Sequence, residues 1–239
     1  HNAMKKLLIF CICTLFIFSC KKEISSKKET FLTKNKSFTL IGTLENFYPQ
    51  KVYLNKIIEN SIFAIDSSAV IENKFNFNGF VEYPERFALS FKEYSATIIL
   101  IIENSTIEID IDANNIEAPI IKGSNLNSKW NEYQLNSKKI FKKIEYLFPQ
   151  FQKYRLENNA EKLYEIGSQM KNIEQEYIVY SYNFIKENNN SYLAAMILRD
   201  QLKNTEIDTI KIPNTYKALS ENVKKSPDAE IISLILNLH

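Results

Sequence analysis

The hydrophobic pattern changes its period near Ser124, and this change constrains the fold more than any other feature of the sequence. Before this point, apolar and polar residues alternate, as in the segment from Lys74 to Gly79, and a period of two is typical of half-buried strands. After it, apolar residues recur at spacings of three and four, which is typical of helices with one buried face. The chain is therefore predicted to be an α+β protein, with an antiparallel β domain over residues 37–123 and an α-helical region over residues 124–239.

Short apolar runs define the expected β domain. They span residues 38–42, 52–54, 62–70, 75–79, 87–91, 96–102, 107–111 and 120–122. The short turns between them favour antiparallel meander pairing, in either a β-sandwich or a half-barrel. The run at 96–102 is nearly all apolar and β-branched, which predicts a central strand buried on both faces.

Two long helical patterns follow, and they predict an antiparallel helical hairpin. The turn is expected at Asn158-Asn159, and Pro149 is expected to kink the first helix or to end it early. Residues of the second helix are expected to form a buried seam, either against the apolar stripe from residue 130 to residue 147 or against the sheet. These residues are Ile166, Met170, Ile173 and Tyr177.

Shorter helices are expected after the hairpin. Three asparagines, at residues 188–190, interrupt the helical pattern, and Ser191 is a suitable N-cap for a helix over residues 192–202. Proline is favoured in the first turn of a helix, so Pro213 is expected to open the last helix, which would continue through Val223.

Residues 4–19 have the features of a lipoprotein signal peptide. Two lysines precede an apolar run from residue 7 to residue 18, and Ile17-Phe18-Ser19 stands immediately before Cys20. The alternative is a membrane-spanning helix, but such a helix needs about 20 apolar residues and this run is shorter. Cys20 is therefore the expected lipid attachment site, and residues 20–36, rich in Lys and Ser, are the expected flexible tether. Residues 1–3 precede Met4 and are interpreted as a cloning remnant.

These features imply a protein of the bacterial cell envelope, held on the membrane by its lipid and expected on the outer membrane, facing the periplasm. The formal net charge is +2, and removal of Lys5 and Lys6 with the leader leaves 2 − 2 = 0. Nucleic-acid binding needs a clustered basic surface, which nothing in the sequence indicates, so no nucleic-acid partner is expected.

The residues that most often perform catalysis are scarce. Cys11 and Cys13 belong to the expected leader, Cys20 is expected to carry lipid, and the two histidines are the terminal His1 and His239. Histidine-based acid–base chemistry, thiol chemistry and the common zinc sites all need such residues in the folded part. We therefore expect no enzyme activity, no catalytic residue, no cofactor and no metal site.

Two polar clusters in the sequence are candidate sites. Glu108, Asp110 and Asp112 share one face of a predicted strand and could bind a hard cation, although alternation of this kind more often marks the solvated face of a half-buried strand. Asp66-Ser67-Ser68 contains serines, which can act as nucleophiles, but the chain has no internal histidine to serve as their base. We therefore expect this segment to form local side-chain-to-backbone hydrogen bonds at a strand end or bulge. The 13 Tyr and 16 Phe could line a pocket, but their spacing favours core packing.

Several short segments, in their order along the chain, resemble a known family. They are Phe38-x-x-x-Gly42, Val52-Tyr53-Leu54, Ile65-Asp66-Ser67-Ser68-Ala69, Lys74-Phe75-x-Phe77-x-Gly79, Ile102-Glu103-Asn104 and Ile121-Lys122-Gly123-Ser124. Their order is similar to that of a domain of unknown function found at the N-terminus of envelope lipoproteins whose C-terminal half is a thioredoxin-like, AhpC/TSA-type thiol-disulfide oxidoreductase. Residues 190–195 and 219–226 resemble the helical region that precedes the thioredoxin domain in those proteins.

The resemblance implies a role without catalysis. The family's redox chemistry lies in a C-x-x-C motif on the thioredoxin domain, and this chain stops at His239, where that domain would begin. The first hypothesis is a non-catalytic envelope lipoprotein that binds a partner, a peptide or a small ligand. The alternative is an accessory or dimerisation subunit of a thiol-disulfide exchange system, acting with a separate thioredoxin-like protein. A carboxylate-based hydrolase or metal enzyme is disfavoured, and the oligomeric state is left open, as is the choice between a natural stand-alone domain and a truncation.

Overall fold

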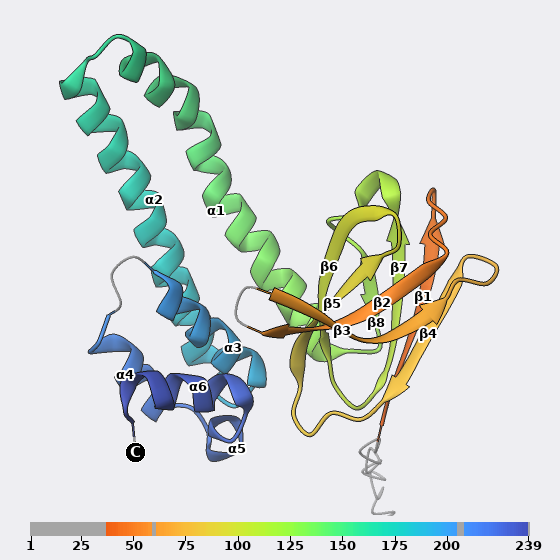
Figure 1. Cartoon of the computed structure of the whole chain (residues 1–239). Coiled ribbons are helices and arrows are strands. Elements are labelled where there is room, and N and C mark those ends of the chain that lie inside the picture. Colours follow the sequence, from red (N-terminus) through yellow and green to blue (C-terminus); the bar gives the residue numbers. More distant parts are fainter. Residues whose placement is uncertain (1–36, 59–60, 205–207, 239) are drawn as a thin grey trace, which may run out of the picture. The chain divides into compact units, whose positions relative to one another are not determined.

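The computed structural model describes residues 37–58, 61–204 and 208–238 (Figure 1). The expected cloning remnant, signal peptide, Cys20 and tether, which together cover residues 1–36, lie outside the described residues. In the described part of the chain, no helix is both long enough and apolar enough to cross a membrane.

The β domain is a sandwich of two four-stranded sheets, which together with the helices confirms the predicted α+β class. One sheet has the order β4-β1-β7-β8, and the other has the order β3-β2-β5-β6. The strands are β1 (Phe38–Glu45), β2 (Lys51–Ile58), β3 (Ser61–Ala69), β4 (Lys74–Gly79), β5 (Glu85–Phe91), β6 (Tyr94–Ile102), β7 (Thr106–Asp112) and β8 (Ile120–Lys122). Alternate side chains of both sheets fill the space between them and form the first hydrophobic core, with Leu40, Leu54, Leu89 and Ile109 fully buried.

The strand pairing is not the predicted meander, because the chain changes sheets repeatedly. β1 pairs antiparallel with β4 but parallel with β7, with Leu40 opposite Phe77 on one side and Ile107 on the other. A parallel pair requires a long connection between its strands, and the strands of the other sheet are part of that connection. Turn length alone does not reveal this arrangement, since a short turn can lead either to the neighbouring strand or to the opposite sheet.

The prediction that residues 96–102 form a central strand is wrong, because β6 is an edge strand. Its first half is largely exposed, whereas Leu100, Ile101 and Ile102 are fully buried. Ile101 belongs to a second core, formed mainly by helices. The apolar run is therefore explained by helices that cover one end of the strand, rather than by strands on both sides.

Helices form the rest of the described chain. They are η1 (Ala113–Asn115), α1 (Asn125–Leu156), α2 (Ala160–Glu187), α3 (Tyr192–Asp200), η2 (Gln201–Lys203), α4 (Lys211–Lys217), α5 (Glu221–Lys224) and α6 (Pro227–Leu236). The predicted hairpin is confirmed, with α1 and α2 joined at Asn158 and Asn159 (Figure 1). Asn158 has φ +50°, and the Asn159 side chain accepts a hydrogen bond from the Lys162 backbone N–H. Asparagine tolerates the left-handed conformation, which suits the turn.

Pro149 does not end α1, which continues to Leu156, so that part of the expectation is wrong. Proline removes one backbone hydrogen bond to the residue four positions earlier, here Glu145. Glu145 is exposed, so water can satisfy its carbonyl oxygen at little cost.

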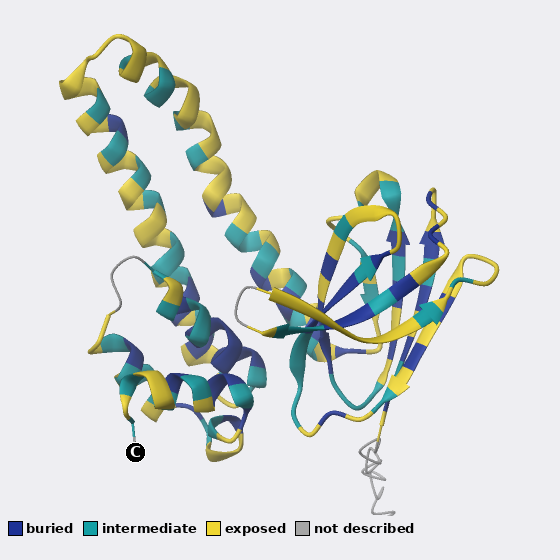
Figure 2. Cartoon of the chain, in the orientation of Figure 1, coloured by how far each residue is buried: buried dark blue, intermediate teal, exposed yellow. Residues whose placement is uncertain are grey.

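The seam of the hairpin is confirmed most clearly at Ile166 and Ile140, which are buried (Figure 2). Met170, Ile173 and Tyr177 are half-buried. They are less buried than predicted because each hairpin helix covers only one face of the other over this length, and the outward faces remain exposed (Figure 2).

Ser191 caps α3 as predicted, by accepting a hydrogen bond from the Leu193 backbone N–H. The prediction for Pro213 is wrong, since α4 begins at Lys211 and ends at Lys217. The Asp208 carboxylate accepts hydrogen bonds from the backbone N–H groups of Ile210 and Lys211, which starts the helix before the proline.

The last helix is α6, which opens at Pro227. The segment between α4 and α5 is non-helical because both the side chain and the backbone carbonyl of Asn189 form hydrogen bonds with it. The Asn189 amide donates to the Ala218 carbonyl oxygen, and the Ser220 N–H donates to the Asn189 carbonyl oxygen.

A buried amide joins the start of α1 to the edge of β6. The fully buried side chain of Asn127 accepts a hydrogen bond from the Ile101 N–H at 2.9 Å and donates one to the Ile101 carbonyl oxygen at 2.7 Å. A neighbouring strand would make the same pair of bonds with this residue. Ser124, the N-cap of α1, bonds both the Asn127 N–H and the Glu103 carboxylate, which fixes the helix start against the end of the strand. Asn127 therefore closes the end of this sheet edge at Ile101.

A charged cluster forms a second joint. Arg86 on β5 makes a bidentate pair with Asp200 on α3, at 2.7 and 3.0 Å, and lies 3.8 Å from Asp228 on α6. Arg199 donates to Asp228 at 3.0 Å. Burial by itself lowers the pKa of Arg86, but the two carboxylates raise it above its ordinary value, so the guanidinium stays charged in the joint. The helices around this cluster form the second core, which includes Trp130, Leu193 and Ile197.

Asn127→Ala should lower the free energy of unfolding by about 3 kcal/mol, because it removes both bonds and leaves the buried Ile101 N–H and C=O unpaired. Urea unfolding would measure the change. Asn125→Ala is the matched control, since Asn125 is exposed in the same helical turn and should change stability by less than about 0.5 kcal/mol. Equal effects of the two substitutions would contradict the role assigned to Asn127.

Candidate functional site

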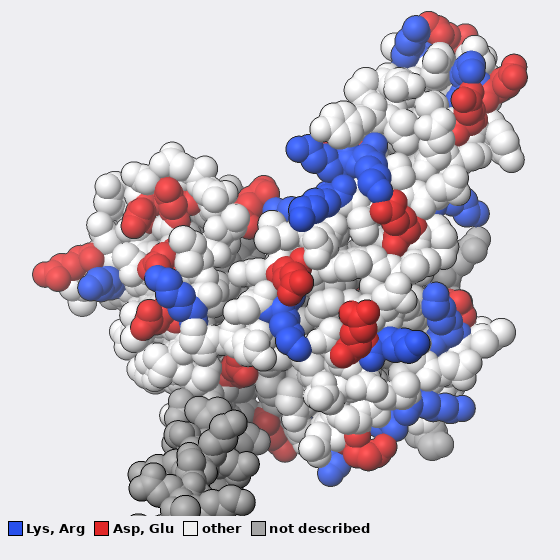
Figure 3. Space-filling view, turned by 180° about the vertical axis from the view of Figure 1, so that it is seen from behind, with Lys and Arg blue, Asp and Glu red and all other residues white. Residues whose placement is uncertain are grey.

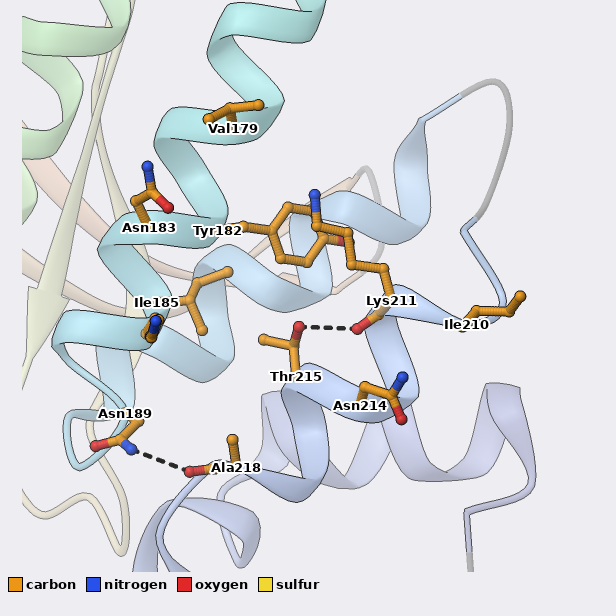
Figure 4. Close-up of a pocket in the computed structure, with 11 residues that line it drawn as sticks. Val179, Tyr182, Asn183, Ile185, Asn189, Ile210, Lys211, Asn214, Thr215 and Ala218 are labelled. Carbon is orange, nitrogen blue, oxygen red and sulfur yellow. Dashed lines mark hydrogen bonds between the residues drawn. The ribbon is translucent and has the colours of Figure 1, made fainter.

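A hollow between the second half of α2 and helix α4 is the best candidate for a binding site (Figure 4). Its volume is about 580 Å³ and its walls are mainly apolar. The lining residues are Val179, Tyr182, Asn183, Ile185, Lys186, Asn189, Ile210, Lys211, Asn214, Thr215 and Ala218. Pockets that bind small molecules have volumes of roughly 300–1,000 Å³, apolar walls and a few polar groups, so this hollow has both the size and the surface of such a site.

The central feature of the hollow is a lysine packed on a tyrosine ring. The Lys211 Nζ lies 4.0 Å from the centroid of the Tyr182 ring, in cation–π contact (Figure 4). Tyr182 is buried, and this burial, with a contribution from the Asp208 carboxylate, raises its pKa to about 12. The phenol is therefore neutral at physiological pH, and the ring offers the ammonium group a fixed apolar face.

Two hydrogen bonds involve residues that line the hollow near α4. The Thr215 hydroxyl donates to the Lys211 carbonyl oxygen at 2.8 Å within the helix, and the Asn189 amide donates to the Ala218 carbonyl oxygen at 3.1 Å (Figure 4). The second bond fixes the end of α4 to the segment that follows α2. Asn183 and Asn214 lie on opposite sides of it (Figure 4).

A second hollow, of about 740 Å³, shares Tyr182 and Lys211 with the first. This second hollow is more polar, with Lys171, Glu174 and Asp208 among its lining residues. The Tyr182–Lys211 pair is therefore a wall shared by an apolar hollow and a polar one.

The three carboxylates on β7 do not assemble a metal site. Asp110 pairs with Lys122 at 3.2 Å, and Asp112 accepts hydrogen bonds from the Asn46 amide and the Asn114 backbone N–H. These bonds lower the pKa of Asp112. Among the residues that the structure describes, no three His, Cys, Asp or Glu side chains come close enough to hold a metal ion. Alternate residues of β7 are buried, which confirms that the strand is half-buried.

The local role predicted for Asp66-Ser67-Ser68 is confirmed. The Asp66 carboxylate accepts a hydrogen bond from the Ser67 N–H, and the Ser68 hydroxyl accepts one from the Asn76 N–H on β4. The strand has a bulge next to these residues, because Leu54 pairs with Asp66 whereas Asn55 pairs with Ala64.

Cys20, the predicted lipid attachment site, lies outside the described residues.

Charges of both signs are interspersed on the face seen in Figure 3, around the helices and the sandwich alike.

The Tyr182–Lys211 pair is the main feature that sequence reasoning missed. The two residues stand far apart in the chain and match no spacing rule, and the tyrosine spacing indicated core packing alone. Only the return of α4 beside α2 brings them together.

Comparison with known proteins bears on the β domain. Residues 38–130 match the family described as Domain of unknown function (DUF4369). The match confirms the family-level resemblance of this part of the chain, while an association with thioredoxin domains stays a prediction. No curated protein and no solved structure gave a match.

The DUF4369 match covers β1 to β8 and the first turns of α1, so it includes Asn127 and ends at Trp130. The joint at Ile101 thus lies within the matched region. The hollow between α2 and α4 lies beyond it.

Proposed function

We propose that this chain is a non-catalytic binding module of the bacterial cell envelope, anchored by a lipid on Cys20. Its ligand is a small molecule or chain end with an apolar body and an anionic group. The observation that carries the proposal is the apolar hollow between α2 and α4 with the Lys211 ammonium at its wall. The DUF4369 description assigns no activity, so the proposal rests on the site itself.

The charge preference follows from the lining residues. Lys186 and Lys211 both line the hollow, and its described lining includes neither Asp nor Glu. A cation–π contact of a partly exposed lysine contributes only about 0.5–1 kcal/mol. A ligand carboxylate or phosphate that bonds the ammonium directly would replace this contact with a stronger charge-assisted hydrogen bond. The ring of Tyr182 would then be free to contact the apolar body of the ligand.

Dodecanoate is a suitable probe because it joins one carboxylate to one apolar chain. Calorimetry should detect binding of dodecanoate to the chain from residue 21 onward, and much weaker binding of dodecyltrimethylammonium or acetate. Lys211→Met should weaken dodecanoate binding about tenfold, which corresponds to the loss of one charge-assisted hydrogen bond.

Lys217→Met is the matched control, since Lys217 is exposed on the same helix and does not line the hollow. It should leave the affinity unchanged. Equal binding of the anionic and cationic surfactants, or equal affinity of both variants, would contradict the proposed site.

The membrane anchor is supported by the leader sequence. Metabolic labelling with a fatty-acid probe should mark the wild-type protein and miss Cys20→Ser, because the thioether bond to lipid forms at that sulfur. Labelling of both proteins to the same extent would show that the lipid is attached elsewhere.

The second candidate function, an accessory subunit that docks a separate thioredoxin-like protein, is favoured by the hairpin. Its distal half exposes Tyr146, Phe148, Leu156 and Tyr164, a set of large apolar side chains on two neighbouring helices. A photo-crosslinking group at Tyr164 would distinguish the two candidates. It should capture a thioredoxin-like protein in the envelope only if this second function is the correct one.

A further inference from the structure

The two edges of the sheet β3-β2-β5-β6 differ in how they are closed. At the β6 edge, the Asn127 amide takes the place of a neighbouring strand at Ile101, near the end of the strand. At the other edge, the second half of β3 lies beside β4, and the Ser68 hydroxyl bonds the Asn76 N–H there. Along the first half of β3, residues 61–65, no other element of the described chain covers the outer edge of the strand. An uncovered edge strand offers backbone N–H and C=O groups to any further strand.

This half of β3 is unusually apolar for an exposed edge. Ile62, Phe63 and Ile65 are 46%, 52% and 56% exposed, and both faces of the strand contribute to the surface. Natural edge strands are commonly protected by lysine or proline, and β3 contains neither. The one charged residue of β3 is Asp66, which bonds its own neighbour Ser67.

We propose that this edge pairs with the same edge of a second copy of the chain, so that two β3 strands lie antiparallel across a two-fold axis. The axis passes beside Ala64, which then faces its own copy. Such an arrangement joins the two sheets into one continuous sheet through the dimer, and it is independent of the ligand hollow and of the proposed function.

The side chains of β3 suit pairing with themselves. With Ala64 at the axis, Phe63 lies opposite Ile65 of the second copy on both sides of the axis, and aromatic–β-branched pairs of this kind stabilise antiparallel strands. Asp66 lies opposite Ile62 of the second copy, so no like charges meet. A two-fold contact uses the same patch twice and closes at the dimer, which limits further association.

The bulge limits the length of the contact. Ile65 has no opposite residue on β2, and a bulged strand bends and twists at such a point. The favourable pairing is thus confined to the few residues around Ala64. A short contact of this kind predicts a reversible dimer, with a dissociation constant on the order of 10 μM.

Sedimentation analysis of the chain from residue 21 onward tests the proposal, because this chain contains the whole compact unit Lys34–His239. The wild type should dimerise, and Phe63→Lys should raise the dissociation constant at least about tenfold by removing the aromatic–β-branched pair and placing a charge opposite Ile65 of the second copy. Ile71→Lys is the control, since Ile71 is exposed but lies beyond the end of β3. A monomeric wild type at about 200 μM, or equal effects of the two substitutions at unchanged melting temperatures, would overturn the proposal.

A cysteine at the axis tests the pairing itself. The chain from residue 21 onward contains no cysteine, so Ala64→Cys introduces the single thiol. Directly opposite residues of antiparallel strands approach closely enough for a disulfide, so mild oxidation should give a covalent dimer. Ile71→Cys should give no covalent dimer under the same conditions, although it should still associate reversibly. A wild-type dimer in which Ala64→Cys fails to cross-link would show that the copies meet at another surface.

Discussion

The contact between the Asn127 amide and the Ile101 backbone determines how the rest of the chain is arranged. An open sheet edge leaves unpaired N–H and C=O groups, and burying them without partners costs about 1–3 kcal/mol for each group. By satisfying both groups of Ile101, the amide allows β6 to be covered by helices rather than by another strand. It also places the first turn of α1 on the sheet, with Ser124 holding the helix start. The direction of the hairpin and the position of the second core follow from this start.

The Arg86 cluster has a different role in the same joint. A buried ion pair contributes little net stability, because desolvation of the charges offsets most of their attraction, but removal of one partner leaves an uncompensated charge. Arg86 is held by Asp200 and approached by Asp228, from two different helices. We therefore interpret the cluster as the element that selects one orientation of α3 and α6 on the sandwich, while apolar burial around Trp130 and Ile197 provides most of the stabilisation. The function proposed for the hollow depends on this joint indirectly. α3 and α6 both pack against α4, which forms one side of the hollow.

Sequence reasoning succeeded where the deciding interaction is local. The period of two at Phe75 and Phe77, the seam of the hairpin, the turn at Asn158 and the cap at Ser191 each depend on residues within a few positions of one another, and the structure contains all of them. Reasoning failed where a distant contact decides. The parallel pairing of β1 with β7 and the edge position of β6 cannot be inferred from local spacing. The start of α4 was missed for another reason, because the local bonds from Asp208 start the helix before Pro213. The same limit applies to Tyr182 and Lys211, whose contact exists only because α4 returns beside α2.

The central claim is that the joint at Ile101, Asn127 and Arg86 makes the sandwich and the helices one cooperative unit. Native-state hydrogen exchange tests it most directly, by comparing core amides of the sandwich, such as Leu40 and Ile109, with core amides of α3, such as Ala195 and Ile197. We predict that both sets exchange through one global opening with the same free energy and the same dependence on denaturant. Exchange of the α3 amides through a separate opening of clearly lower free energy, while the sandwich amides stay protected, would contradict it.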